Sequence, residues 1–451
     1  MIKEKKMPAP TEKQWLLGNL GKFYQKPLTY IAEAKQEVGD IFEIKSPFGK
    51  LIAIANPAYI KHVLQDNNKN YHKGMAYRVT KPLLGEGLLT SEGEFWRKQR
   101  RLIQPAFHKA KLENLFDIMQ ETTKTVIEEW KKTYKNGDKI NISKEMNRLA
   151  LLIVSKSLFQ SDISAEIDTI SDNLEKSLER AIERIKKPWL LPVWIPTLAN
   201  LREQKIQETL KGVVRKIIEQ RKSEQVVYDD LLDMLMQARD EENENPMTEQ
   251  QLLDEVMTIF LAGHETTANA LAYSFLLLTQ HQEEGQKVFE EVKNLLGREP
   301  LSYVNSRSLE YTKLVIQETL RMYPPAWVIT RFSLAEDQIG EYKIDAETGV
   351  VINIFTMHHL EEYWDKPEEF IPERFKTEKF KNLPKFVYLP FGGGPRICIG
   401  EHFAFLEMTT ILSLISQSFF FKEIREYKLE LLPLLTLRPK EDIELYIYHR
   451  E

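Results

Sequence analysis

The stretch FGGGPRICIG, from Phe391 to Gly400, contains Cys398, the only cysteine in a chain of 451 residues. Three glycines and a proline precede the cysteine, and glycine lets a backbone turn tightly and approach a ligand closely. An apolar, helix-like run, HFAFLEMTTILSLISQSF, follows it. The N-terminal end of such a helix favours a thiolate over a thiol, whereas a free cysteine elsewhere is usually a small buried hydrophobe.

The single cysteine restricts the metal sites that the chain can build. One thiolate cannot supply the several ligands of a structural zinc or iron–sulfur site, whereas a haem iron with one axial thiolate needs a single cysteine. Because no second cysteine exists, an internal disulfide is excluded, which fits a reducing compartment.

The loop around the cysteine resembles the cysteine-ligand loop of the cytochrome P450 family, the haem-thiolate monooxygenases. That family's pattern is Phe-x-x-Gly-x-Arg-x-Cys-x-Gly, and it is met here by Phe391, Gly394, Arg396, Cys398 and Gly400. The resemblance implies a mainly α fold with a minor β-sheet region. It also implies non-covalent haem b, with the Cys398 thiolate on the iron and Phe391, Gly392 and Arg396 beside the cofactor.

Composition favours one domain, and we expect residues 1–451 to form a single haem-binding monooxygenase domain without a fused reductase. The chain shows no repeat and no linker rich in glycine, serine or proline. Its net charge of −5 gives no reason to expect nucleic acid. The start, MIKEKKMPAP, lacks a signal-peptide core and the roughly 20 apolar residues of a membrane span. We therefore expect a soluble, cytoplasmic monomer of bacterial type.

The longest predicted helix carries an unusual centre, FLAGHETTAN. Thr248 and Gln251 form a capping box, and the helix extends to about Gln280. A mid-helix glycine, Gly263, costs about 1 kcal/mol relative to alanine. The hydroxyl of Thr266 can bond a carbonyl one turn back, which bends helices. Local rules broken inside a strong helix often mark a functional site.

This centre resembles the family's oxygen-binding motif, with Glu265 and Thr266 as its acid–alcohol pair. The resemblance gives them the delivery of protons to dioxygen and turns Ala262 toward the haem plane. In some relatives a glutamate at the place of Ala262 links covalently to haem, so non-covalent haem is expected here. His264 is expected to point away from the iron.

Trp96 and Arg100, in the stretch EFWRKQRRLIQPAF, are four residues apart and share one face of a predicted helix. Both side chains are hydrogen-bond donors without acceptor capacity, which suits a carboxylate. The resemblance makes that carboxylate a haem propionate and adds Arg331 as a further ligand. The alternative is a solvated basic helix.

Glu318 and Arg321 in ETLRMYPPAW, with Arg374 in PERF, resemble the family's buried structural triad. By resemblance, the triad fixes the segment that presents the cysteine loop. Positions in the apolar substrate pocket are carried over in the same way, to Leu89, Ala262, Ala326, Val328 and Leu435.

Two further segments concern the substrate. Residues 71–89 are expected to form an irregular cover, and KKPWLLPVWIPT, residues 186–197, resembles a lid connection, with ordinary loop packing as the alternative. Lys50 occupies the place of a basic anchor in bacterial fatty-acid hydroxylases, but Ile54 replaces the anchor's usual tyrosine partner.

The remaining pattern predicts a helix over residues 28–38, strands over 41–46 and 51–56, and helices from 110 to 240 apart from the proline-rich break. Strands are also expected over 339–344 and 350–357, and a hairpin near Leu435.

The implied reaction inserts one oxygen atom of O₂ into a C–H bond of an apolar small molecule, a fatty acid, terpenoid or steroid. Electrons come from an external ferredoxin or flavodoxin with its reductase, or from a diflavin reductase. We expect the donor to dock on the face of Cys398, near a set of basic residues: Lys376, Lys379, Lys381, Lys385 and Arg396. A peroxide-driven peroxygenase or isomerase, and a haem-based sensor without turnover, are alternative functions.

Overall fold

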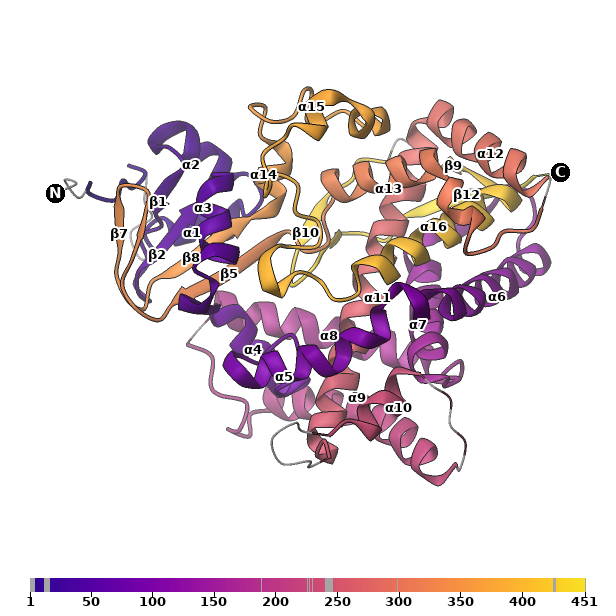
Figure 1. The fold of residues 1–451 in the computed structure, drawn as a ribbon, viewed down its shortest axis with the longest axis horizontal. Coiled ribbons are helices and arrows are strands. Elements are labelled where there is room, and N and C mark those ends of the chain that lie inside the picture. The colour runs from indigo at the N-terminus through magenta and orange to yellow at the C-terminus, as the bar shows by residue number, and fades with distance from the viewer. Residues whose placement is uncertain are drawn as a thin grey trace.

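The fold is built around one long helix, α11 (Glu249–Gln280), which crosses the middle of the molecule (Figure 1). The computed structural model describes residues 5–11, 17–187, 189–224, 226, 228, 230–239, 246–297, 299–424 and 427–450. The capping box predicted for Thr248 and Gln251 is present. The helix is unbroken at Gly263, where a Cβ atom would approach Val154 of a neighbouring helix to 2.9 Å. Close packing therefore requires the glycine.

Helices surround α11 on several sides, and it packs against α7, α9, α13 and α16. The chain's apolar residues around it form the larger hydrophobic core. The helices in chain order, apart from α11, are α1 (Leu20–Gln25), α2 (Tyr30–Val38), α3 (Pro57–Lys61), α4 (Met75–Leu84), α5 (Gly93–Ile103), α6 (Lys109–Thr133), α7 (Ile142–Phe159), α8 (Ile167–Lys186), α9 (Leu198–Ser223), α10 (Leu231–Gln237), α12 (Gln282–Leu296), α13 (Glu310–Met322), α14 (Ile354–His359), α15 (Glu378–Lys381) and α16 (Glu401–Ser418).

Short 3-10 or π turns join several of these helices. They are η1 (His62–Asp66), η2 (Asn68–Asn70), η3 (Gln104–Phe107), η4 (Asn305–Ser308), η5 (Pro372–Lys376) and η6 (Gly394–Arg396). The last two carry the PERF segment and the cysteine loop.

A five-stranded sheet lies to one side of the helices, beside α1, α2 and α3 (Figure 1). Its strand order is β1-β2-β8-β5-β3, with β2 and β8 parallel and the other pairs antiparallel. The strands are β1 (Ile41–Glu43), β2 (Leu51–Ile54), β3 (Tyr71–Lys73), β5 (Val328–Ser333) and β8 (Gly349–Asn353). A second apolar core lies under this sheet.

Three smaller sheets complete the β structure of the described residues. They are the hairpin β6 (Asp337–Ile339) and β7 (Tyr342–Ile344), the hairpin β10 (Leu431–Pro433) and β11 (Leu437–Pro439), and the sheet β4 (Asp138–Asn141), β12 (Glu444–His449) and β9 (Phe419–Glu423). The mainly α fold with minor sheets is therefore confirmed, as is the hairpin near Leu435.

Four local expectations were wrong. The single strand expected over 339–344 is instead a turn between two strands, since β6 ends at Ile339 and β7 begins at Tyr342. Residues 71–89 are not irregular, because they contain β3 and the helix α4. The helix tolerates Pro82 because the proline lies in its last turn, where it costs one backbone hydrogen bond. Residues 354–357 begin α14, since the side chain of Asn353 caps that helix by accepting from Thr356 N. Residues 138–141 form β4, which interrupts the helical region through pairing with the C-terminal strand.

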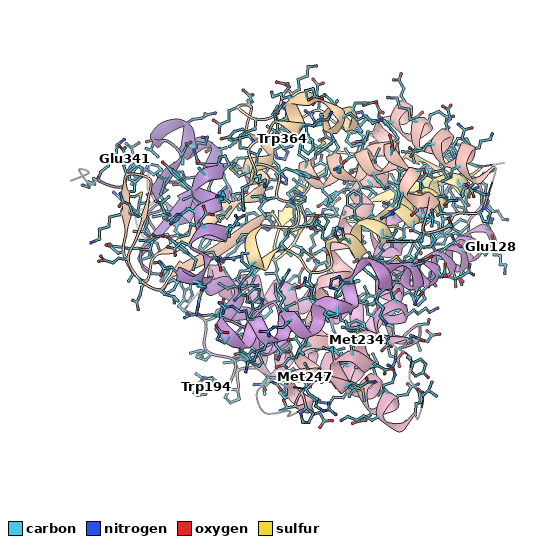
Figure 2. The ribbon with its side chains drawn as sticks, in the orientation of Figure 1. Glu128, Trp194, Met234, Met247, Glu341 and Trp364 are labelled. Carbon is cyan, nitrogen blue, oxygen red and sulfur yellow. The ribbon has the colours of Figure 1, made fainter. Side chains whose placement is uncertain are left out.

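The proline-rich connection between α8 and α9 projects from the molecule (Figure 2). Trp189 is 63% exposed and Trp194 is 77% exposed. Packing of both indoles against the core is thereby excluded. Within the described residues, none of the helices combines the length and the apolar character that crossing a bilayer requires.

Candidate functional site

The cysteine loop is held in a tight turn by its glycines. Gly392 and Gly394 have φ angles of 76° and 70°, in the region that favours glycine. A Cβ atom on Gly394 would lie 1.9 Å from the carbonyl oxygen of Leu64, so any larger residue would displace the loop. The backbone N–H of Cys398 donates to the carbonyl of Phe391 at 2.9 Å and closes the turn.

The thiol of Cys398 is accessible, although protein encloses the sulfur closely enough that burial raises its pKa to about 11. Both observations hold for a thiol on the wall of an interior space. The backbone N–H of Gly400, at the start of α16, lowers the pKa, but burial outweighs it. The start of α16 thus acts in the expected direction, toward the thiolate, but does not overcome burial by itself. A cation bound directly to the sulfur is required.

The middle of α11 has one accessible window. From Leu252 to Thr279 every residue is buried except Ala262, Gly263 and Thr266, which share one face. Because other helices surround α11, this window borders an interior space. The hydroxyl of Thr266 donates to the carbonyl of Ala262 at 2.8 Å, one turn back.

Glu265 lies beside Thr266 in sequence but faces a different element. Its Oε1 accepts a hydrogen bond from the hydroxyl of Thr436, in the β10–β11 turn, at 2.6 Å. Its Oε2 is buried and has no hydrogen-bond partner among the described residues. Burial raises the pKa of Glu265, and the bond from Thr436 lowers it. His264 is also buried, and burial lowers its pKa to about 4, so its ring is neutral.

Basic side chains gather beside the cysteine loop. Arg100 donates to the carbonyl of Ile397 at 2.8 Å, which joins α5 to the loop. The guanidinium of Arg396 lies 4.1 Å from the ring centroid of Trp96 and forms an ion pair with Glu92. The pKa of Arg396 is lowered to about 10, chiefly by burial, although the charge of Glu92 opposes the shift. These side chains are therefore enclosed rather than solvated, which argues against the basic-helix alternative.

A further basic residue, Lys73, was missed from the sequence because residues 71–89 were expected to be irregular. Strand β3 places Lys73 directly opposite Arg331 on β5. Burial, and then the charges of Arg331 and Arg396, hold the pKa of Lys73 well below its ordinary value. Like charges opposite each other on paired strands are destabilising, so this arrangement favours an anion between them.

The residues fit a haem group on three independent counts. The loop offers one accessible thiol as an iron ligand. Lys73, Arg331 and Arg396 all lie near the carboxylate of Glu92, which cannot neutralise three cations, so two propionates would balance the excess positive charge. A Cβ atom added to Gly392 would meet a single atom of the described residues within 4 Å, Cδ1 of Ile329. There is therefore room for a cofactor beside Gly392.

Glu318, Arg321 and Arg374 are in contact and buried. The carboxylate of Glu318 accepts from Nε of Arg321 at 2.8 Å and from Nε of Arg374 at 2.9 Å. It also accepts from the backbone N–H of Ile371 at 2.9 Å. The guanidinium of Arg374 donates to the carbonyl of Asp365 at 2.7 Å. This network ties α13 to the segment that precedes the cysteine loop.

His358 extends the network to the loop, and sequence reasoning missed it. The carbonyl of His358 accepts from Arg321 at 2.9 Å, and Nε2 accepts from the backbone N–H of Leu389 at 2.8 Å. Leu389 lies two residues before Phe391, whose carbonyl holds Cys398. Burial keeps the pKa of His358 well below its usual value, so Nε2 remains an acceptor.

The predicted pocket positions border open or half-open space. Ala262 and Ala326 are exposed although they lie on interior elements, and Leu89, Val328 and Leu435 are half-buried. Lys50 instead lies at the surface, where it pairs with Asp345. The geometry therefore gives no support to a carboxylate anchor at Lys50.

The basic residues that were predicted to bind the electron donor present less free positive charge than the sequence suggests. Arg396 points inward to Glu92, so its inclusion among the surface cations was wrong. The lysines are mostly paired with carboxylates, at the following N–O distances: Lys376 with Glu310 at 4.0 Å, Lys379 with Asp365 at 2.7 Å and Lys381 with Glu378 at 2.6 Å.

Comparison with known proteins agrees with the site. Residues 8–445 match the family described as Cytochrome P450. The chain is 31% identical over 423 residues to Cyclooctat-9-en-7-ol 5-monooxygenase of Streptomyces melanosporofaciens, covering 91% of each chain. It is 30% identical to Cyclooctatin synthase of the same organism, over 95% of this chain and 91% of that one. It is also 30% identical to 11-oxo-beta-amyrin 30-oxidase of Glycyrrhiza uralensis, over 88% and 78%. The chain therefore belongs to the cytochrome P450 family of haem-containing oxidoreductases.

Proposed function

We propose that this protein inserts one oxygen atom of O₂ into a C–H bond of a cyclic terpenoid, with electrons from a separate redox protein. One observation carries the proposal: the accessible thiol of Cys398 lies close enough to Arg100 to feel its charge, beside the enclosed cations around Arg396. The window on α11 supports it, since it borders an interior space. In such a site the bound haem iron supplies the activation of dioxygen.

The chain's own residues have distinct parts in holding the cofactor. Cys398 would supply the thiolate that holds the iron, because no other thiol exists in the sequence. Trp96, Arg100, Arg331 and Arg396 bind the propionates, and Lys73 joins them because it faces Arg331 across the strands. Phe391 and Gly392 form the floor beside the sulfur. No glutamate stands at position 262, so haem b is bound without a covalent link.

Proton movement is assigned to the acid–alcohol pair. The hydroxyl of Thr266 is on the accessible face of α11, where it can hold and orient a water molecule. Glu265, the next residue, is buried and faces the β10–β11 turn, and burial raises its pKa, which favours the protonated carboxyl group as a proton source. The surrounding apolar residues exclude bulk water from this exchange.

The substrate class is inferred from the side chains at the predicted pocket positions and from the names of similar proteins. Ala262, Ala326, Val328, Leu89 and Leu435 present small or aliphatic surfaces, which suit an apolar ligand. Two relatives are named for oxidising cyclooctat-9-en-7-ol and 11-oxo-beta-amyrin. Lys50 is engaged by Asp345 at the surface, so a fatty-acid carboxylate has no anchor there. A cyclic terpenoid alcohol or ketone therefore fits better than a fatty acid.

The electron donor is an external ferredoxin or flavodoxin with its reductase, or a diflavin reductase, docking over the cysteine loop. Lys385 is exposed on this side of the chain and has no carboxylate partner among the described residues. Because the neighbouring lysines are paired, we expect reduction to depend only modestly on ionic strength.

The test combines spectroscopy with isotope labelling. Purified protein is screened with cyclic terpenoid alcohols and matched fatty acids for shifts of the haem Soret band. Hits are then incubated with a ferredoxin, its reductase, NADPH and ¹⁸O₂. We expect products that carry one ¹⁸O atom, and Cys398→Ala should lose both product and the thiolate-type spectrum of the reduced carbon monoxide complex. Product formed from hydrogen peroxide alone, without ¹⁸O from O₂, would instead identify a peroxygenase.

A further inference from the structure

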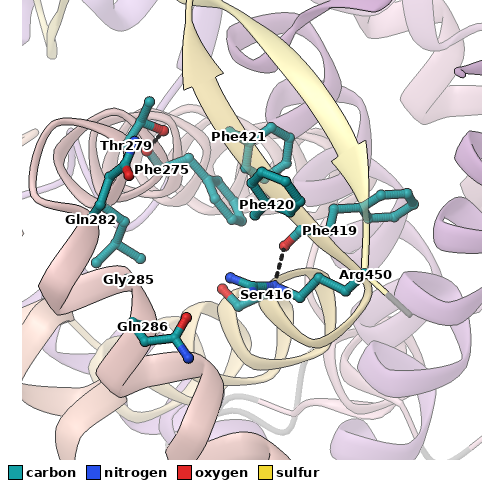
Figure 3. Close-up of a pocket in the computed structure, with 11 residues that line it drawn as sticks. Phe275, Thr279, Gln282, Gly285, Gln286, Ser416, Phe419, Phe420, Phe421 and Arg450 are labelled. Atoms are coloured by element: carbon teal, nitrogen blue, oxygen red, sulfur yellow. Dashed lines mark hydrogen bonds between the residues drawn. The ribbon is translucent and has the colours of Figure 1, made fainter. Parts of the chain in front are cut away.

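A separate cavity of about 260 Å³ lies where α11 and α16 end (Figure 3). The last turns of these two helices, the first turns of α12, strand β9 and Arg450 enclose it. None of its lining residues belongs to the cysteine loop or to the window on α11. Phe275, on its wall, is nine residues beyond Thr266, about 13 Å along the helix axis.

Arg450 brings a positive charge into this cavity. Its Nε donates to the carbonyl of Phe419 at 3.2 Å, and its guanidinium lies 3.9 Å from the ring centroid of Phe289. Figure 3 shows the guanidinium extending across the cavity toward Ser416. Burial lowers the pKa of Arg450. The two terminal nitrogens have no hydrogen-bond acceptor among the described residues, so the guanidinium can still bind an anion.

Two carboxylates close in sequence to the lining residues are engaged elsewhere, while Glu283, next to Gln282, is exposed. Glu284, in the first turn of α12, pairs with Lys287 at 2.9 Å and accepts a hydrogen bond from Tyr311. Glu423, at the end of β9, accepts from Gln280 at 2.9 Å. Among the described residues no carboxylate forms an ion pair with Arg450, whereas the buried Arg321 and Arg374 both contact Glu318 and the half-buried Arg438 contacts Glu175 and Glu179.

The other lining residues indicate what kind of molecule could carry the negative group that Arg450 binds. Phe275 and Phe421 form an edge-to-face pair with centroids 5.3 Å apart, and Leu278 adds an aliphatic wall. Four polar side chains also line the cavity. Thr279 donates to the carbonyl of Phe275 and Gln286 donates to Glu290. The hydroxyl of Ser416 and the side-chain amide of Gln282 make no hydrogen bond to the described residues. A planar apolar body with one negative group therefore matches the lining.

We propose that this cavity, the Arg450 cavity, binds a small monocarboxylate with an aromatic or short aliphatic body. The carboxylate bonds the two terminal nitrogens of Arg450, a geometry that guanidinium and carboxylate groups share. Gln282 donates to the same carboxylate, and the body packs between Leu278 and the phenylalanine pair. This site is distinct from the haem site and does not depend on the proposed monooxygenase activity.

The test measures binding of benzoate, with benzyl alcohol as the uncharged match, by isothermal titration of the purified protein. Arg450→Met removes the charge and keeps the apolar stem of the side chain. Gln282→Glu, at an exposed position, supplies Arg450 with an internal carboxylate. Arg202→Met, on the exposed face of α9, is the control for loss of a surface charge. The haem Soret band is recorded in parallel.

We expect saturable binding of one benzoate to the wild-type protein, with benzyl alcohol bound at least about tenfold more weakly. Arg450→Met and Gln282→Glu should each weaken benzoate by about tenfold or more, while Arg202→Met leaves it unchanged. The Soret band should not move. The proposal is overturned if the wild-type protein shows no saturable binding. It is also overturned if both cavity variants bind benzoate as tightly as wild type, since the anion then occupies another place, such as the haem site.

Discussion

Thr436 and Glu265 are joined by a 2.6 Å hydrogen bond between residues 171 positions apart in the sequence. The bond connects the β10–β11 hairpin, beside the pocket residue Leu435, to the acid of the long helix. Arg438, further along the hairpin, pairs with Glu175 of α8 at 2.9 Å and with Glu179 at 3.2 Å. The β10–β11 hairpin therefore links α8, which precedes the loop of Trp189 and Trp194, to Glu265, the side chain that we propose supplies protons.

We expect Thr436→Val to raise the pKa of Glu265, because the lost hydrogen bond is one of the influences that lower it. The protonated carboxyl band in the infrared spectrum should then persist to higher pH. Glu265→Gln identifies the band by abolishing it, and Thr436→Ser, which keeps the hydroxyl, should restore the wild-type titration. An unchanged titration in Thr436→Val would show that the bond does not govern Glu265.

Thr266→Ala should still bind haem and substrate but lose much of the coupling between reductant and product. Without the hydroxyl on the accessible face of α11, water is held less well where protons are delivered, an effect of about 10²–10⁴-fold in general acid catalysis. The measurement is the ratio of product formed to NADPH consumed, with hydrogen peroxide assayed alongside.

Ser274→Ala is the matched control for Thr266→Ala. Ser274 lies on the same helix and makes the same kind of bond, to the carbonyl of Ala270 at 2.9 Å, but it is buried away from the window. Its product ratio should equal that of wild type. A Thr266→Ala enzyme with an unchanged ratio and little peroxide would reduce Thr266 to a packing residue.

His358→Phe should loosen the cysteine loop, because it leaves the buried N–H of Leu389 without its acceptor. A buried donor without a partner costs about 1–3 kcal/mol. We expect a lower melting temperature and a smaller fraction of thiolate-type spectrum in the reduced carbon monoxide complex. His359→Phe is the control, since His359 bonds the carbonyl of Phe355 within its own helix. Equal behaviour of the two variants would exclude the proposed link.

Glu255→Gln should change how stability depends on pH. Burial raises the pKa of Glu255 to about 8 from an ordinary value of 4.5, while its Oε2 accepts from the backbone N–H of Leu88 at 2.9 Å. Between these pH values the folded protein keeps a proton that the unfolded chain releases. Wild-type stability from this group therefore falls as pH rises from about 4.5 to 8.

Glutamine carries no such proton, so the stability of Glu255→Gln does not fall in this way. Between about pH 4.5 and 8 its free energy of unfolding should therefore rise relative to that of wild type by on the order of 1–3 kcal/mol. Denaturant unfolding at pH 5 and pH 9 measures the difference. Glu283→Gln, at an exposed position of α12, should track wild type at both values. A constant difference between Glu255→Gln and wild type would contradict the raised pKa.

The sequence by itself determined the parts of the protein whose physics is local. The capping box at Thr248 and the apolar run that follows were enough to predict α11, and the glycines before Cys398 were enough to predict a tight backbone turn. The spacing of Glu318 and Arg321 follows from one helical turn. Each of these depends on residues within a few positions of one another.

Tertiary structure decided everything that depends on distant partners. Lys73 acquired its place among the cations only because β3 pairs with β5, and residues 354–357 became helical only where Asn353 could cap them. The pKa of Cys398 is raised because burial outweighs the helix N-terminus, which lowers it as expected. Desolvation and strand register are set by segments far apart in the chain, so neither could be calculated from the residues adjacent to these groups.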